Sequence, residues 1–127
     1  MFYSKIIIYG GFNEKAVLTD YHVFNTVNKT WLESPTLEGD QPHPRERFSL
    51  VSYHDKNLIL FGGYYCSEDL EVEEHYNDVY ALHLGSLEWH RLECDGEPPK
   101  PRFAHTASII HKSMYIFGGV NREGSVV

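Results

Sequence analysis

The segment Leu58-Ile59-Leu60-Phe61-Gly62-Gly63 places a short apolar run before an aromatic residue and two glycines. The same pattern occurs at Ile6–Gly11 and at Met114–Gly119. The first glycines of successive doublets lie 52 and 56 residues apart. A period near fifty residues is typical of a repeated supersecondary unit. We therefore expect a fold that is built from similar copies of one unit.

Two further markers recur in step with the glycine doublets. Asp20 precedes Trp31 by eleven residues, and Asp78 precedes Trp89 by the same spacing. The residues just after each aspartate are rich in β-branched and aromatic side chains, which suit a pleated, half-buried surface. Both segments are therefore predicted to be strands.

A polar, proline-rich turn follows each tryptophan and ends at an arginine. Gly39 precedes Arg45 by six residues, and Gly96 precedes Arg102 by six. His105 stands shortly after the second arginine, whereas Ser49 stands at the matching position of the preceding unit. This substitution marks one of the few differences between otherwise parallel units.

Taken together, these motifs resemble the kelch repeats of β-propeller proteins, and the resemblance covers nearly the whole chain. It implies an all-β fold, a partial kelch-type β-propeller, in which antiparallel four-stranded blades form an open arc. We expect a single kelch-repeat region over residues 1–127, divided into an incomplete first blade (1–45), a complete second blade (46–100) and the start of a third blade (101–127). Propellers close with about four to eight blades.

An open arc of this kind would leave the flat faces of its terminal blades uncovered. The first interpretation is therefore that the 127 residues are a fragment or a truncated form of a longer propeller. A homo-oligomer, in which several copies restore the missing neighbours, is the alternative.

The recurring residues are interpreted as structural markers of the blades. Paired glycines allow positive φ or a close approach of the backbone, and replacing Gly62 by valine should destabilise folding. The tryptophans should lie in the core between blades, because their position repeats whatever each blade binds. The markers are Gly10, Gly11, Gly62, Gly63, Gly118, Gly119, Trp31 and Trp89.

Charge is distributed unevenly along the chain. The net charge of −7 disfavours binding to nucleic acid. The span from doublet to aspartate is six residues longer in the second unit than in the first, and this insertion is acidic. It is either a solvated loop or a recognition patch for a basic partner. The candidate patch contains Tyr64, Tyr65, Glu68, Asp69, Glu71, Glu73 and Glu74.

Arg45 and Arg102 are candidates for the partner surface, and a structural role between blades is the alternative. In kelch blades such an arginine often ties neighbouring blades together, yet it also lies near a loop that contributes to the ligand face.

No catalytic, cofactor or metal site is predicted, although the chain has eight histidines. A few kelch proteins are enzymes, namely iron-dependent nitrile specifiers and copper radical oxidases related to galactose oxidase. In the nitrile specifiers, the resemblance implies a loop that carries glutamate, aspartate and histidine at four-residue steps. Glu71 is four residues before His75, but Ser67 stands four residues before Glu71. A fragment of such a metalloenzyme, or a non-functional truncated propeller, therefore remains the alternative function.

The resemblance implies a binding module rather than an enzyme: a scaffold or a substrate-recognition platform, as in ubiquitin-ligase adaptors. The partner would be a protein or peptide, held by the inter-strand loops. These loops are 12–19, 33–46, 64–77 and 93–100. No stretch of eighteen apolar residues predicts a membrane span. Only Cys66 and Cys94 are present, which favours reduced thiols and a cytoplasmic or nuclear location.

Overall fold

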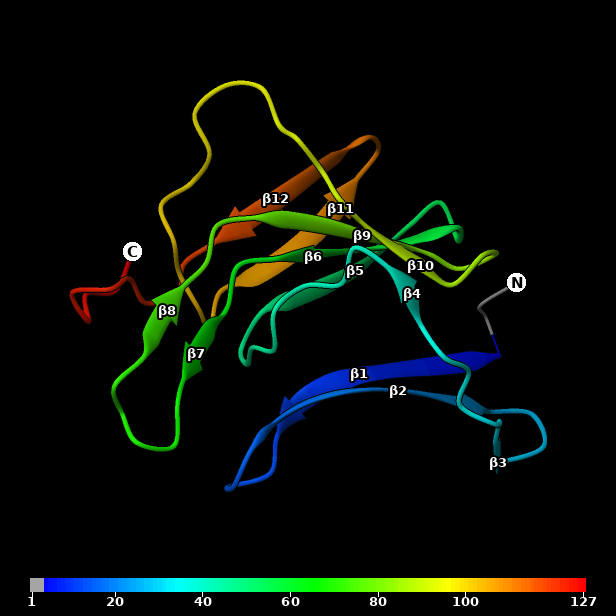
Figure 1. Cartoon of the computed structure of the whole chain (residues 1–127). Coiled ribbons are helices and arrows are strands. Elements are labelled where there is room, and N and C mark those ends of the chain that lie inside the picture. The colour runs from blue at the N-terminus through cyan, green and yellow to red at the C-terminus, as the bar shows by residue number, and fades with distance from the viewer. Residues whose placement is uncertain (1–3) are drawn as a thin grey trace.

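The computed structural model describes residues 4–127 and shows an all-β chain whose strands form three successive sheets and a projecting hairpin. The strands run as a layered arc, with β1 and β2 at one end and β11 and β12 at the other (Figure 1). Their bounds are β1 Lys5–Phe12, β2 Val17–Asn25, β3 Thr30–Trp31, β4 Glu38–Gly39, β5 Ser49–Tyr53, β6 Asn57–Phe61, β7 Tyr64–Cys66, β8 Glu73–His75, β9 Val79–His83, β10 Glu88–Arg91, β11 Thr106–Ile110 and β12 Ser113–Phe117.

The central sheet has the strand order β4-β10-β9-β6-β5. Strands β5, β6, β9 and β10 pair antiparallel in sequence order, which is the arrangement of a four-stranded blade. The β5–β6 turn places His54 and Asp55 at φ 51° and 54°. Two consecutive positive φ values define the type I′ turn, whose twist matches that of a hairpin.

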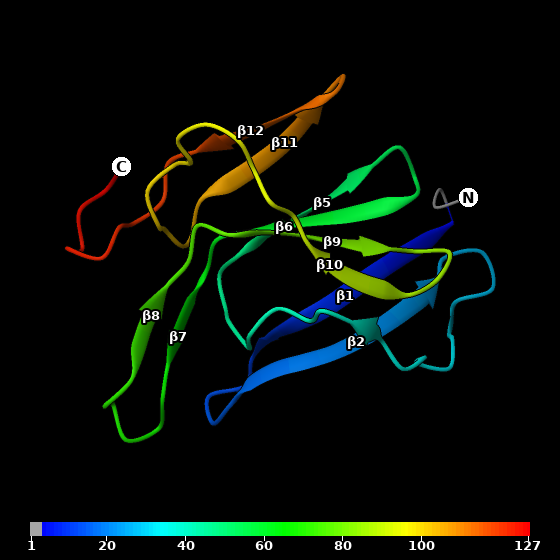
Figure 2. The same cartoon turned by 45° about the horizontal axis from the view of Figure 1, so that its top comes forward.

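Two smaller sheets flank the central one. Strands β1, β2 and β3 form the first, and strands β11 and β12 form the last. Figure 2 shows the three sheets fanned out, with the first and last sheets on either side of the central one. The predicted fold class, an open arc of antiparallel blades, is therefore confirmed.

The core lies between the first sheet and the central sheet. Trp89 is fully buried, and its ring centroid lies 5.2 Å from that of Tyr9 in the first sheet. Leu58 and Leu60 of β6 join the same cluster, as does Leu82 of β9. An aromatic side chain of this size buries roughly 150–250 Å² of surface. The indole of Trp89 therefore anchors one sheet onto the next.

Trp31 does not share this environment within the described residues, so the expected position between blades is observed for Trp89 alone. Its side chain is 60% exposed. Trp89 is covered by the sheet that precedes its own in the chain, and no described residue forms a sheet on the corresponding side of β3. The same repeat position is therefore buried or open according to whether a neighbouring sheet lies on that side.

Two glycines are required by close backbone approaches. Gly62 has φ 69°, and a Cβ there would lie 2.8 Å from the carbonyl oxygen of Arg102. Gly39 has φ 85°, and a Cβ there would clash with the carbonyl oxygen of Trp89. The close approach at Gly62 agrees with the interpretation that the doublets allow positive φ and close backbone contact.

Two strand pairings differ from the sequence interpretation. The span 64–77, expected to be a loop, forms the β7–β8 hairpin with the register Tyr65↔Glu74. Strand β4, which was not expected, pairs parallel with β10 through Gly39 and Trp89. Neither pairing has a local sequence pattern, because each depends on what lies beside the segment in space. Residues 4–127 contain no helix long and apolar enough to cross a bilayer.

Candidate functional site

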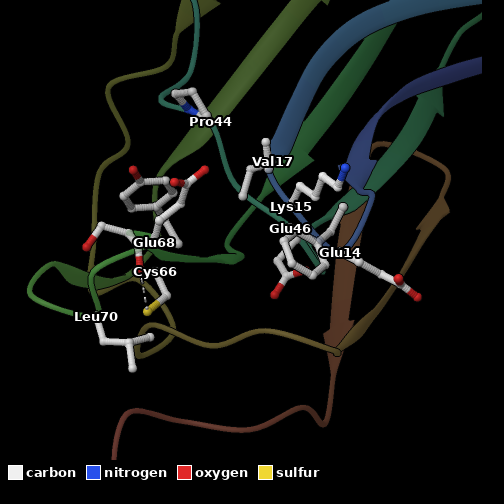
Figure 3. A pocket seen from close by; sticks show the side chains of 12 residues that line it. Glu14, Lys15, Val17, Pro44, Glu46, Cys66, Glu68 and Leu70 are labelled. Carbon is white, nitrogen blue, oxygen red and sulfur yellow. Dashed lines mark hydrogen bonds between the residues drawn. The ribbon is translucent and has the colours of Figure 1, made fainter.

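A cavity of about 470 Å³ opens between the β1–β2 turn and the β7–β8 hairpin. Figure 3 shows the side chains that line it, with Glu14, Lys15 and Val17 on one side and Cys66, Glu68 and Leu70 on the other. Pro44 and Glu46, from the segment before β5, complete the wall. Three of the four loops expected to hold a partner, 12–19, 33–46 and 64–77, therefore meet at one cavity.

Local backbone geometry shapes the β1–β2 side of this cavity. The Oδ1 of Asn13 accepts hydrogen bonds from the backbone N–H groups of Lys15 and Ala16, at 3.1 and 2.8 Å. Such Asx turns hold a short connection in one conformation. The turn leaves Phe12 54% exposed at the cavity.

The lining combines apolar side chains with an excess of carboxylates. Phe12 and Leu70 are both largely exposed, on opposite sides of the opening. Glu14, Glu46 and Glu68 contribute three carboxylates, against one ammonium group from Lys15. The Glu46 carboxylate is already paired with Arg47, whose Nε lies 3.8 Å away. The cavity is therefore suited to an apolar group that carries positive charge beside it.

The acidic residues of the hairpin do not share one face. Of the five acids in the predicted set, only Glu68 lines the cavity. Glu73 pairs with Cys66 and Glu74 pairs with Tyr65, so the two glutamates point to opposite faces of the hairpin. Glu74 lines a separate, smaller cavity with Lys100 and Arg122. Sequence clustering did not indicate this division, because it depends on strand register.

Asp69 stabilises the tip of the β7–β8 hairpin by accepting hydrogen bonds. Its Oδ1 accepts a hydrogen bond from Ser67 Oγ at 2.5 Å and another from the backbone N–H of Glu71 at 3.0 Å. These two donors hold the pKa of the Asp69 carboxyl below its usual range, because both favour the ionised form. The carboxylate therefore closes the turn between β7 and β8.

The two tyrosines of the predicted patch face different surroundings. Tyr65 lines the cavity, and its ring meets that of His43 edge-on, with centroids 4.7 Å apart. Tyr64 packs against Phe103, with centroids 5.1 Å apart. Burial, together with the neighbouring Cys66, raises the pKa of Tyr64 to about 12. Its hydroxyl therefore stays protonated, and its ring packs against His75 and Phe103.

Arg45 is 2% exposed, and its contacts favour the structural interpretation over partner binding. The guanidinium donates to both carboxylate oxygens of Asp78, and it donates to the carbonyl oxygen of Gly62 at 3.1 Å. Its Nε donates to the carbonyl oxygen of His43 at 3.0 Å. The guanidinium also lies 3.7 Å from the ring centroid of Tyr76. No part of this side chain is free to reach a ligand.

Arg102 repeats half of this arrangement. Its Nε donates to the carbonyl oxygen of Lys100, and its Nη1 donates to the carbonyl oxygen of Gly118, both at 3.1 Å. No carboxylate among the described residues pairs with it as Asp78 pairs with Arg45. Arg102 is half-buried, and it lies outside the cavity lining.

Ser49 and His105, which differ between equivalent positions of the two units, lie against each other. Ser49 Oγ and His105 Nε2 share a hydrogen bond of 2.9 Å, and both side chains are 8% exposed. Burial lowers the pKa of His105, and the nearby Arg102 adds to this effect. The pair therefore joins the central sheet to the last sheet rather than marking a binding site.

Within residues 4–127, no group of three or more His, Cys, Asp or Glu side chains converges as metal ligands would. Cys66 and Cys94 are both free thiols. The fourth expected loop, 93–100, lines another cavity with Phe61 and Met114, between the central and last sheets.

The chain resembles several kelch-repeat proteins. Host cell factor 1 from Homo sapiens is 33% identical over 122 residues, which cover 93% of this chain and 6% of that protein. Kelch domain-containing protein 1 from Homo sapiens is 32% identical over 137 residues, which cover 91% of this chain and 34% of that protein. Host cell factor homolog hcf-1 from Caenorhabditis elegans is 33% identical over 124 residues, 93% of this chain and 15% of that protein.

The chain thus spans about a third or less of the length of these relatives. The model of the KLHDC2/KLHL20/DRC7 Kelch-repeats domain matches residues 1–126. Together with the three sheets of the arc, this match confirms the resemblance first indicated by the glycine doublets and the recurring tryptophans. The chain belongs to the kelch-repeat family.

Proposed function

We propose that this chain is a protein-recognition module, and that it holds its partner in the cavity between the β1–β2 turn and the β7–β8 hairpin. Kelch-repeat domains generally mediate protein–protein interaction. The observation that carries the proposal is the combination of exposed Phe12 and Leu70 with three carboxylates around one opening. Loops on a rigid sheet scaffold are where binding groups usually lie.

The partner that fits this cavity is a peptide segment with one apolar side chain beside a lysine or arginine. Phe12 and Leu70 would cover the apolar group, and removal of that surface from water would supply the main favourable free energy. Glu14 and Glu68 would attract the positive charge and select against acidic segments, whereas Glu46 is already paired with Arg47. We expect such a module to act as a scaffold or a substrate-recognition platform, such as an adaptor of a ubiquitin ligase.

A peptide library displayed on phage tests the proposal, because it samples many candidate partner segments at once. Selection on the purified chain should enrich peptides with an apolar residue flanked by Lys or Arg. In calorimetry, Glu68→Lys should weaken binding of an enriched peptide by about tenfold, because an attractive charge becomes repulsive. Phe12→Ser should weaken binding through loss of apolar contact.

Glu71→Lys is the matched control, since Glu71 is an exposed acid on the same hairpin that does not line the cavity. It should change the affinity much less than Glu68→Lys. Enrichment of no basic peptide, or equal loss of affinity from both lysine variants, would reject this cavity as the site.

A further inference from the structure

Three aromatic side chains contact one another at the wall of the cavity between the β1–β2 turn and the β7–β8 hairpin. Tyr65 of β7 lines the cavity, whereas His43 and Tyr76 do not. The ring centroid of His43 lies 4.7 Å from that of Tyr65 and 6.2 Å from that of Tyr76. His43 therefore stands between a residue of the cavity wall and one that lies outside the lining.

The blade framework does not require these three residues. Lys100 occupies the repeat position of His43, two residues before the arginine, and Leu18 occupies that of Tyr76, two residues before the aspartate. The position of Tyr65, two residues after the doublet, is asparagine in the other units, at Asn13 and Asn121. All three aromatic residues are therefore particular to the second unit, which favours a role at the cavity over a role in the framework.

The imidazole of His43 is held by polar contacts on one of its nitrogens. Its Nδ1 shares a hydrogen bond of 3.0 Å with the hydroxyl of Tyr76, and it lies 3.0 Å from the carbonyl oxygen of Pro44. The backbone carbonyl of His43 also accepts the hydrogen bond from Nε of Arg45. Both the backbone and the ring of His43 are thus fixed.

Tyr76 is fixed in turn by the buried ion pair of the central sheet. The guanidinium of Arg45 lies 3.7 Å from the ring centroid of Tyr76, and it pairs with the carboxylate of Asp78. Burial raises the pKa of the Tyr76 hydroxyl, which therefore stays protonated. A continuous series of contacts runs from this ion pair through Tyr76 and His43 to Tyr65.

The segments that carry His43 and Tyr65 are also joined through their backbones. The N–H of Glu46 donates to the carbonyl oxygen of Tyr64 at 2.8 Å, and the N–H of Tyr64 donates to that of Glu46 at 2.9 Å. The two rings therefore meet on paired segments. A side chain that is ordered before binding loses less conformational entropy when a ligand covers it.

We propose that His43 is a positioning residue, which fixes the ring of Tyr65 in the cavity wall, and that the hydroxyl of Tyr76 fixes His43. Its consequence for affinity rests on the proposed function, because an ordered Tyr65 favours binding of a peptide in this cavity. His43 and Tyr76 act through Tyr65, since neither lines the cavity.

Calorimetry with a peptide enriched on the purified chain tests this consequence. His43→Ala should weaken binding by about tenfold, because Tyr65 must then be ordered on binding. His43→Phe restores an aromatic contact with Tyr65, so it should recover most of this loss. Tyr76→Phe removes one hydroxyl and keeps the ring beneath the guanidinium, so it should weaken binding by about threefold.

The double variant His43→Ala/Tyr76→Phe should bind no more weakly than His43→Ala alone, because both changes act through the same contact. Tyr53→Phe is the matched control. The ring of Tyr53 also meets a histidine edge-on, 4.2 Å from the centroid of His54, but it lies outside the cavity lining. This variant should leave the affinity unchanged, whereas additive losses in the double variant would contradict the series of contacts.

Nuclear magnetic resonance of the free chain tests the positioning without any peptide. The ¹³C order parameter of the Tyr65 side chain, whose signal is identified by its loss in Tyr65→Phe, should fall in His43→Ala and in Tyr76→Phe. An unchanged order parameter in both variants would overturn the inference, even where no peptide is enriched. Failure to enrich a peptide would count against the proposed function alone. Binding that depends on Glu68 but not on His43 would overturn the inference and leave the proposed function standing.

Discussion

Trp31 and Trp89 occupy the same position of the repeat, yet one is 60% exposed and the other is fully buried. Both lie on a strand that follows an aspartate by the same spacing, and both pair with an aromatic or aliphatic residue of their own sheet. The difference arises from the neighbouring sheet, which supplies Tyr9 to Trp89 and nothing to Trp31 within the described residues. A repeat position therefore specifies which face a side chain occupies, and the neighbour decides whether that face is buried.

The largest expected effect comes from truncating the buried tryptophan. Trp89→Ala should lower the free energy of unfolding by about 3–5 kcal/mol, because it leaves a cavity between two sheets. Trp31→Ala should change it by about 0.5 kcal/mol or less, as exposed positions usually do. Urea denaturation measures the free energy of unfolding of both variants.

The Trp89→Phe variant sharpens the comparison. The Nε1–H of Trp89 is buried and has no hydrogen-bond partner among the described residues. Phenylalanine removes this unsatisfied donor and keeps most of the apolar surface, so it should cost much less than alanine. Equal effects of alanine at positions 31 and 89 would contradict the packing that distinguishes them.

The two arginines should show a smaller contrast of the same kind. Arg45→Ala should cost about 2–3 kcal/mol, because it leaves the carboxylate of Asp78 largely buried without its partner. Arg102→Ala should cost about 1 kcal/mol, since only hydrogen bonds to two carbonyl groups are lost.

A double-mutant cycle identifies the source of this difference. Asp78→Ala should show strong coupling with Arg45→Ala and none with Arg102→Ala, measured by urea denaturation. Coupling of similar size for both arginines would contradict the observed pairing.

The smallest effect is expected from pH. The folded state lowers the pKa of His105, so below the unfolded pKa of about 6.5 the unfolded chain binds the proton more readily. His105 should therefore reduce stability as pH falls from about 7 toward its folded pKa. Thermal unfolding across this range should show a weaker pH dependence for His105→Gln than for the wild-type chain. His111→Gln, at an exposed position, is the control, and an equal change in both variants would contradict the role of burial.

Much of the fold could be predicted from local pattern. The residues after Asp20 and Asp78 predict the strands β2 and β9, and the apolar runs before the glycine doublets coincide with β1, β6 and β12. The candidate site could be predicted less well from the sequence. The cluster of acids predicts Glu68 as a binding residue, whereas Phe12, Glu14 and Glu46 join it only because two distant turns meet. Nothing in the local sequence marks that meeting.

The sequence by itself determined the repeat, the all-β architecture and the faces on which the recurring side chains lie, because strand periodicity and glycine requirements act over a few residues. Only the tertiary structure decided which tryptophan is buried, that Arg45 is held internally, and that the acids of the β7–β8 hairpin point to opposite faces. These outcomes depend on contacts between segments far apart in the chain, and on register, which a one-residue shift would invert.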